Sequence, residues 1–105
     1  MDQSIKQIFL QDILESIETT NRDLKISQDG LKWIEEKIAL YSGLEKRLGN
    51  SVDDENLRKY IQRRLERWEK IGLEDKQKIQ EAEDKIKFLE GVQENIENRK
   101  DDLSL

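Results

Sequence analysis

The sequence contains no cysteine, no histidine and no proline in 105 residues. Without cysteine the chain has no disulfide and no thiolate metal ligand, and without histidine it lacks the commonest zinc ligand and the usual base of catalytic triads. The longest apolar run, residues 38–41, is far shorter than the roughly 20 residues of a membrane-spanning helix. We therefore expect no cofactor, no metal site and no membrane association.

The first residues also lack a basic segment followed by an apolar one, which is the pattern of a signal peptide. We expect a cytoplasmic protein. The length allows a single helical domain, residues 1–105, with a small core.

Charged side chains make up 41% of the chain, and the formal net charge is −5. Residues 1–50 contain 7 basic and 9 acidic side chains, residues 51–72 contain 6 and 5, and residues 73–105 contain 6 and 10. This acidic balance disfavours attraction of the whole surface to nucleic acid or to an anionic membrane.

The residue types that dominate the chain are strong helix formers, namely leucine, isoleucine, lysine, glutamate, glutamine and arginine. No segment alternates apolar and polar residues over the length of a strand. Because proline, the strongest helix breaker, is also missing, the sequence predicts an all-α protein.

Apolar residues recur every seven positions in both halves of the chain, as in the seam of a coiled coil. Nine of eleven positions in the two rows of the first half are apolar, and nine of twelve in the second half. The first half has the rows Leu10, Ile17, Leu24, Leu31, Ile38 and Ile13, Thr20, Ser27, Ile34, Tyr41, Leu48. The second half has the rows Ile61, Trp68, Asp75, Ala82, Leu89, Ile96, Leu103 and Leu65, Gly72, Ile79, Ile86, Gln93.

A turn signal separates the two halves. Gly49 suits the left-handed residue that ends a helix, and Ser51, followed by acidic residues, suits an N-cap. The sequence therefore predicts an antiparallel helical hairpin with a coiled-coil-like seam. Arm one covers about residues 3–48, the turn residues 49–51, and arm two about residues 52–100. In this register residue j lies opposite about 100 − j.

Each arm contains weak helix formers, at 19–21 and 29–30 in the first and at 71–73 in the second. Two folds are compatible with them. Either both arms run unbroken with a polar layer midway, which is the arrangement we expect, or the arms break there and fold into a compact monomeric three- or four-helix bundle.

Parts of the first arm are apolar over a wider angle than a two-helix seam requires. Wide apolar faces usually mark an interface, so we expect dimerisation to complete a four-helix bundle. The alternatives are another partner protein and a bent first arm that covers its own surplus. The predicted interface residues are Ile5, Phe9, Leu10, Ile13, Ile17, Trp33, Ile34, Ile38, Tyr41 and Leu48.

Two charged residues fall on the apolar side of the second arm. Arg64 projects near the middle of that side, and Asp75 occupies a seam position. A guanidinium there extends to solvent, pairs with a carboxylate or contacts a partner, and an Arg–Asp pair can fix the register between chains. Both are therefore candidate polar register or partner contacts.

A basic stripe lies on the second arm, formed by Lys59, Arg63, Arg67 and Lys70. With Tyr60 and Trp68 nearby it is a candidate anion-binding surface. Acidic residues such as Glu66 and Glu69 are interleaved with it, as on an ordinary solvated helix face. Nucleic acid is therefore an alternative partner rather than the expected one.

Carboxylates are the remaining candidate metal ligands. Glu81 and Asp84 have the E-x-x-D spacing of MazG-type nucleotide pyrophosphohydrolases. Ala39 stands where the accompanying E-E-x-x-E helix needs its third acid, so half of that motif is missing.

We expect a non-enzymatic protein–protein interaction module, such as an adaptor, assembly factor or inhibitor, that acts by helix packing as a homodimer.

Overall fold

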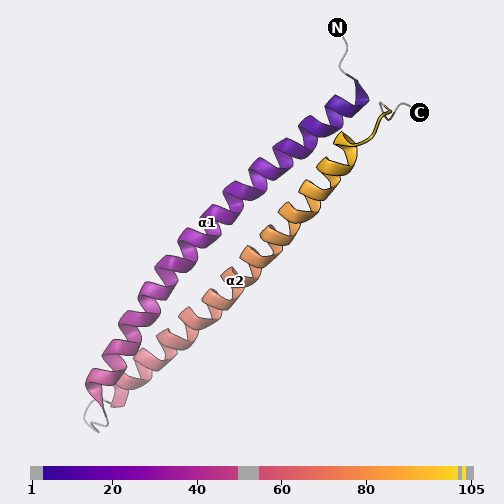
Figure 1. Ribbon diagram of the computed structural model, residues 1–105. Coiled ribbons are helices and arrows are strands. Elements are labelled where there is room, and N and C mark those ends of the chain that lie inside the picture. The colour runs from indigo at the N-terminus through magenta and orange to yellow at the C-terminus, as the bar shows by residue number, and fades with distance from the viewer. Residues whose placement is uncertain (1–3, 50–54, 102, 104–105) are drawn as a thin grey trace. The chain divides into compact units, whose positions relative to one another are not determined.

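The computed structural model of the chain describes residues 4–49, 55–101 and 103. These residues form two α-helices, α1 (Ile5–Leu48) and α2 (Glu55–Glu97), packed as an antiparallel hairpin (Figure 1). The predicted all-α helical hairpin is therefore confirmed. Neither helix has a stretch of described residues long and apolar enough to cross a membrane.

Both helices run without a break through the positions where the sequence suggested interruptions. The threonines at 19 and 20 and Gly30 lie inside α1, and Gly72 lies inside α2. The long-arm arrangement is therefore correct, and the compact bundle with broken arms is wrong. A glycine inside a helix costs about 1 kcal/mol relative to alanine, which the packing of a long helix offsets.

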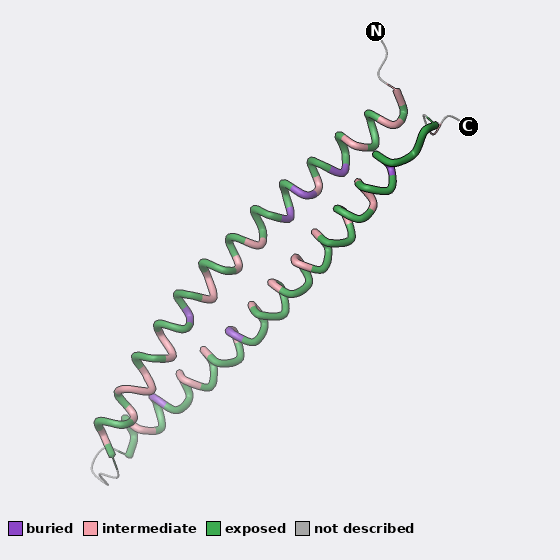
Figure 2. The backbone as a smooth tube through the Cα atoms, viewed as in Figure 1, coloured by how far each residue is buried: buried purple, intermediate pink, exposed green. Residues whose placement is uncertain are grey.

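The predicted seam is the contact between the two helices. All 23 seam positions are buried or half-buried, and all except Leu103, which follows α2, belong to the facing sides of α1 and α2 (Figure 2). The polar members follow the same pattern. Thr20 is buried and its hydroxyl donates to the Ser16 carbonyl oxygen at 2.7 Å, so the polar group is satisfied within α1.

The chain divides into two compact units, which we call the terminal unit (residues 1–25 and 79–105) and the tip unit (residues 26–78). The core of the terminal unit consists of Ile13, Ile17 and Ile96, with partly buried Leu10, Leu89, Val92 and Leu103 packed against it. The core of the tip unit centres on Ile34 and Ile61.

Gly72 is a buried contact between the two helices in the tip unit. A Cβ atom at this position would lie 3.5 Å from Ile34 Cγ2 and 3.9 Å from Leu31 Cδ1. These are ordinary van der Waals distances, so a methyl group would fit here, and apolar side chains of α1 lie directly beside the Gly72 backbone. What the sequence offered as a possible helix end is a buried contact point in the middle of α2.

A cation from the facing helix binds carbonyl oxygens at the C-terminal end of each helix. The Lys6 ammonium donates to the carbonyl oxygens of Glu97, the last residue of α2, and of Arg99 beyond it. The Arg58 guanidinium donates to the carbonyl oxygen of Gly49 after α1. Carbonyl groups at helix C-termini lack intrahelical donors and carry partial negative charge. These hydrogen bonds satisfy some of those carbonyl oxygens and link each helix to the C-terminal end of the other.

Gly49 has a φ of +57°, as its predicted role at the end of a helix requires. The rest of the predicted turn, including the N-cap Ser51, lies outside the described residues. The register differs slightly from the predicted one. Contacting pairs such as Trp33–Trp68 and Lys6–Glu97 have numbers that add up to 101 and 103, because α1 ends at Leu48 and α2 begins only at Glu55.

Two glycine substitutions should change stability in opposite directions. Gly91→Ala should raise the free energy of unfolding by about 1 kcal/mol, because Gly91 is helical and an added Cβ meets no atom within 4 Å. Gly49→Ala should lower it by about 1 kcal/mol, because alanine is strained at positive φ. Urea denaturation followed by circular dichroism measures both, and effects of the same sign would contradict this account.

Candidate functional site

The tip unit has a second apolar stripe besides the seam. Ile26, Trp33 and Leu40 follow one another at seven-residue spacing on α1, and Leu44 lies one turn further. All four are exposed, Trp33 by 51% and Leu40 by 54%. At 100° per residue the stripe is turned by roughly 120° from the centre of the seam. It is therefore not covered by the packing of α1 on α2.

Residues of α2 extend this stripe across the hairpin. Leu57 and Tyr60 are about half-exposed and lie opposite Leu44, with which they share a cavity of about 340 Å³. We call the resulting surface the tip face; its members are Ile26, Trp33, Leu40, Leu44, Leu57 and Tyr60. It presents apolar groups from both helices on one side of the tip unit.

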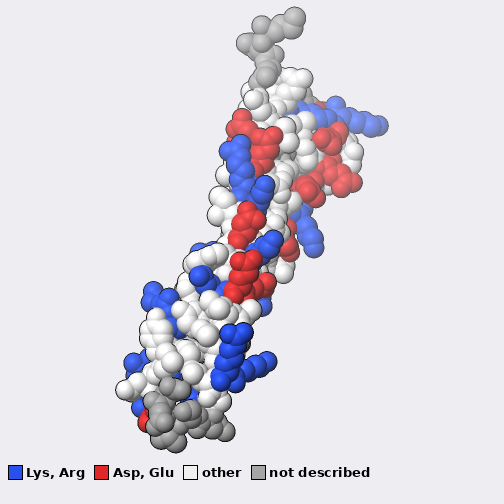
Figure 3. All heavy atoms as spheres, turned by 90° about the vertical axis from the view of Figure 1, so that its left-hand side faces the viewer, with Lys and Arg blue, Asp and Glu red and all other residues white. Residues whose placement is uncertain are grey.

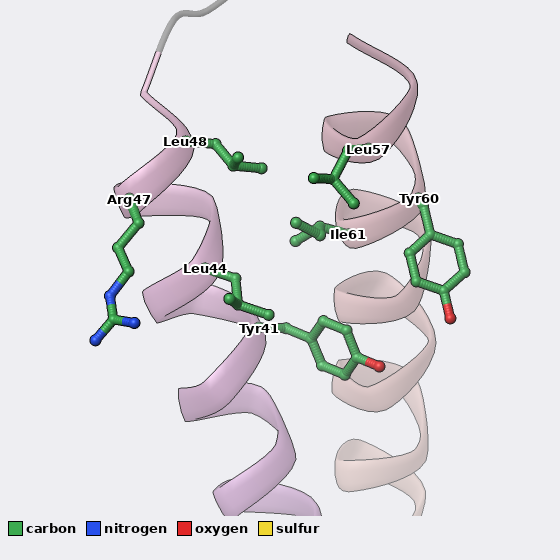
Figure 4. Close-up of a pocket in the computed structure, with 7 residues that line it drawn as sticks. All are labelled: Tyr41, Leu44, Arg47, Leu48, Leu57, Tyr60 and Ile61. Carbon is green, nitrogen blue, oxygen red and sulfur yellow. The ribbon is translucent and has the colours of Figure 1, made fainter. Parts of the chain in front are cut away.

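The cavity lies between the ends of the two helices. In Figure 4 Leu44 and Leu48 point toward α2, Leu57 and Ile61 point toward α1, and the Arg47 guanidinium is directed away from the space between them. The other lining residues are Tyr41 and Tyr60. An apolar floor with phenol groups beside it suits an apolar side chain better than a charged ligand.

The opposite side of the tip unit is mostly polar, and Leu73 is its one exposed large apolar side chain among the described residues. Helical spacing places Gln28, Glu35 and Ser42 of α1 there, together with Gln62, Glu69 and Lys76 of α2. The two sides of the same hairpin therefore differ in chemistry, and only one has the apolar character of an interface.

Trp33 of the tip face belongs to a cluster of two tryptophans and two cations. The rings of Trp33 and Trp68 meet edge to face with centroids 5.1 Å apart. The Lys37 ammonium lies 5.3 Å from the Trp33 centroid, and the Arg64 guanidinium carbon lies 5.4 Å from the Trp68 centroid. These aromatic and cation–π contacts fix the orientation of Trp33 at the surface.

The structure places the two predicted polar register residues apart. Arg64 is half-buried over Trp68, and its Nε has no hydrogen-bond partner among the described residues. Asp75 is also half-buried, with Oδ2 3.6 Å from where a Cβ of Gly30 would lie. Eleven residues of helix separate them by about 16 Å, so they form no pair within the chain. Their predicted role between chains stays a prediction.

The predicted basic stripe is exposed along its length. Lys59, Arg63, Arg67 and Lys70 all have exposed side chains, and Lys59 forms an ion pair with Glu55 at 3.3 Å. Surface ion pairs four residues apart on a helix contribute only about 0.3–0.5 kcal/mol. The stripe is accessible to an anionic partner.

The terminal unit has a different surface. A hollow of about 270 Å³ in this unit is polar and is lined by Asp12, Glu15, Ser16, Thr19, Thr20 and Lys85. After α2, the Arg99 guanidinium forms hydrogen bonds of 2.9 and 3.0 Å with Asp101. These bonds hold the pKa of the Asp101 carboxyl below its ordinary value and raise the pKa of Arg99. Within the part of the chain that the structure describes, no three acidic residues are arranged to hold a metal ion.

The predicted interface residues fall into two groups. Leu10, Ile13, Ile17, Ile34, Ile38, Tyr41 and Leu48 are buried or half-buried seam residues, whereas Ile5, Phe9 and Trp33 are exposed. Of the six tip-face residues the predicted interface contains only Trp33, and it lacks Ile26, Leu40, Leu44, Leu57 and Tyr60. The signal for Ile26 was its seven-residue spacing from Trp33 and Leu40. Leu57 and Tyr60 could be assigned to the tip face only once the structure showed which side of the hairpin they share with Leu44.

Comparison of the chain with known protein families, with curated proteins and with solved structures found no match.

Proposed function

We propose that this protein is a protein–protein interaction module that self-associates by helix packing, with the tip face at the interface. The observation that supports this most directly is that, among the described residues, all exposed large apolar side chains of the tip unit except Leu73 lie on the tip face. Contiguous exposed apolar surface bordered by polar residues usually marks a contact with another protein. The opposite, mostly polar side of the tip unit has the composition of a solvated surface.

The mechanism is docking of helices on helices. Trp33 is an anchor, because large aromatic side chains supply much of the binding energy in protein interfaces and its orientation is held by Trp68 and Lys37. The cavity between Leu44 and Leu57 receives an apolar side chain of the partner. Two hairpins joined in this way form a four-helix assembly.

The proposal assigns no catalytic role. An activated serine needs an adjacent base, and the sequence contains no histidine to supply one. We propose a cytoplasmic adaptor, assembly factor or inhibitor. Each of these acts by presenting a defined surface rather than by chemistry at a site.

A matched pair of leucine substitutions tests the proposal. Leu40→Asp introduces a charge into the tip face, where Leu40 is 54% exposed, whereas Leu73→Asp introduces it at a 67% exposed position of α2 outside that face. Both changes cost similar helix propensity. Light scattering on a sizing column should show the assembly dissociating in Leu40→Asp and unchanged in Leu73→Asp, with both variants helical. Equal masses for the two variants would refute the role of the tip face.

A nucleic-acid-associated small helical subunit is the second candidate function. It is favoured by the exposed basic stripe Lys59, Arg63, Arg67 and Lys70. Phosphate contacts by such residues give binding that weakens as salt is raised. In that case the wild-type chain binds a labelled oligonucleotide at low salt, and Arg63→Glu with Arg67→Glu reduces the affinity at least about tenfold. A flat wild-type titration at low salt would eliminate this candidate.

A further inference from the structure

Cations outnumber acids on the side of the tip unit that carries the tip face. Positions a multiple of seven residues from a tip-face residue share its side of a supercoiled helix. In the tip unit, these rows and the adjoining outer row of each helix hold seven basic and three acidic side chains. The rest of the described tip unit holds five basic and six acidic ones. The cationic excess is therefore confined to the side of the tip face.

The excess lies on α2. Helix α1 supplies two cations and two acids to this side, which are Lys37, Arg47, Asp29 and Glu36. Helix α2 supplies five cations and one acid, which are Arg63, Arg64, Arg67, Lys70, Lys78 and Glu74. None of the five forms an ion pair with a residue that the structure describes. Figure 3 shows basic side chains gathered near the turn end of the hairpin, at the bottom of the view. A partner placed over the tip face therefore meets a row of cations along α2.

Two of these cations are arginines in the same heptad rows as tip-face residues. Arg64 follows Leu57 by seven residues, and Arg67 follows Tyr60 by seven. A guanidinium binds a carboxylate through two parallel hydrogen bonds, and it is more weakly hydrated than an ammonium group. Arginines at the border of an apolar surface therefore suit the carboxylates of a partner whose facing groups are otherwise apolar.

The apolar groups of the tip face extend over the length of a helix. Ile26 and Leu44 are 18 residues apart on α1, which is about 27 Å along its axis. An α-helix of about 20 residues covers this distance. The cavity of about 340 Å³ between Leu44 and Leu57 lies at one end of it and has room for an apolar side chain. The tip face therefore has the length and the chemistry to receive one amphipathic helix.

We infer that the tip face also binds an acidic amphipathic helix of another protein. The apolar side of that helix packs on Trp33, Leu40 and Leu57, and its carboxylates lie against the cations of α2. The inference rests on the tip face being an interface, as the proposed function does, and goes beyond self-association because the two occupants compete for this face. A second copy of the tip unit brings the same cations to the contact, where like charges oppose association, whereas an acidic helix neutralises them.

Two synthetic peptides without tryptophan test the inference on the full chain. Each has 21 residues with leucines at heptad spacing, and the positions beside the leucines are glutamate in one peptide and lysine in the other. Binding is followed by the emission of the chain's own tryptophans, because Trp33 is 51% exposed and becomes buried under a docked helix. The acidic peptide should bind at least about tenfold more tightly than the basic one at low salt. The net charge of −5 favours the basic peptide, so this preference reports the local cations.

The outcomes separate this inference from self-association. Equal affinities for the two peptides, or tighter binding of the basic one, overturn it. Binding of an oligonucleotide but of neither peptide assigns the cations to nucleic acid and overturns it as well. A chain that dimerises but binds neither peptide, even after dilution to the monomer, overturns this inference alone. A chain that binds the acidic peptide and stays monomeric without it supports this inference and overturns self-association.

Charge reversal with a matched control locates the contact. Arg63→Glu together with Arg67→Glu should weaken binding of the acidic peptide at least about tenfold, because both exposed side chains then repel it. Lys32→Glu together with Lys76→Glu changes the net charge equally at exposed positions on the opposite side of the tip unit, and should leave the affinity within about twofold. Circular dichroism checks that both variants are helical. Equal losses in the two variants would mean that only net charge matters and would overturn the inference.

Discussion

The apolar seam between α1 and α2 is the contact on which the rest of this structure depends. It is thin, because two helices alone enclose no interior layer: the most buried apolar side chains are Ile61 at 3% and Ile34 at 4% exposure, and few others approach them. Hairpins of this kind bury a small fraction of their apolar surface. A second layer of helices on the tip face adds to that burial, so the proposed self-association also supports the fold.

The sequence predicted the seam and the length of the helices well. A seven-residue apolar period requires only that both helices keep one side inward, and the lack of proline lets them continue. Gly72 and Asp75 were harder to interpret, because a glycine or an acid at a seam position is also what a helix end or a break would show. In the structure Ile34 lies against Gly72 and Asp75 lies beside Gly30, so both positions are contacts between continuous helices.

The tip face could be predicted only in part. Trp33 was recognised as an interface residue from the width of the apolar pattern, but Leu57 and Tyr60 were not, because their place beside Leu44 depends on the register between the helices. That register depends on where α1 ends and α2 begins, at Leu48 and Glu55, and helix boundaries are the least determined feature of a sequence pattern. The seam could not show which side of the hairpin remains apolar.

The mass of the unaltered chain in solution tests the central claim most directly. Sedimentation equilibrium over a range of micromolar concentrations should give a species of twice the 12.5 kDa chain mass at the higher concentrations. On dilution this dimer should dissociate to the monomer. A mass of 12.5 kDa at every concentration, in a chain that is fully helical, would contradict self-association and leave the tip face without the second copy that this account requires.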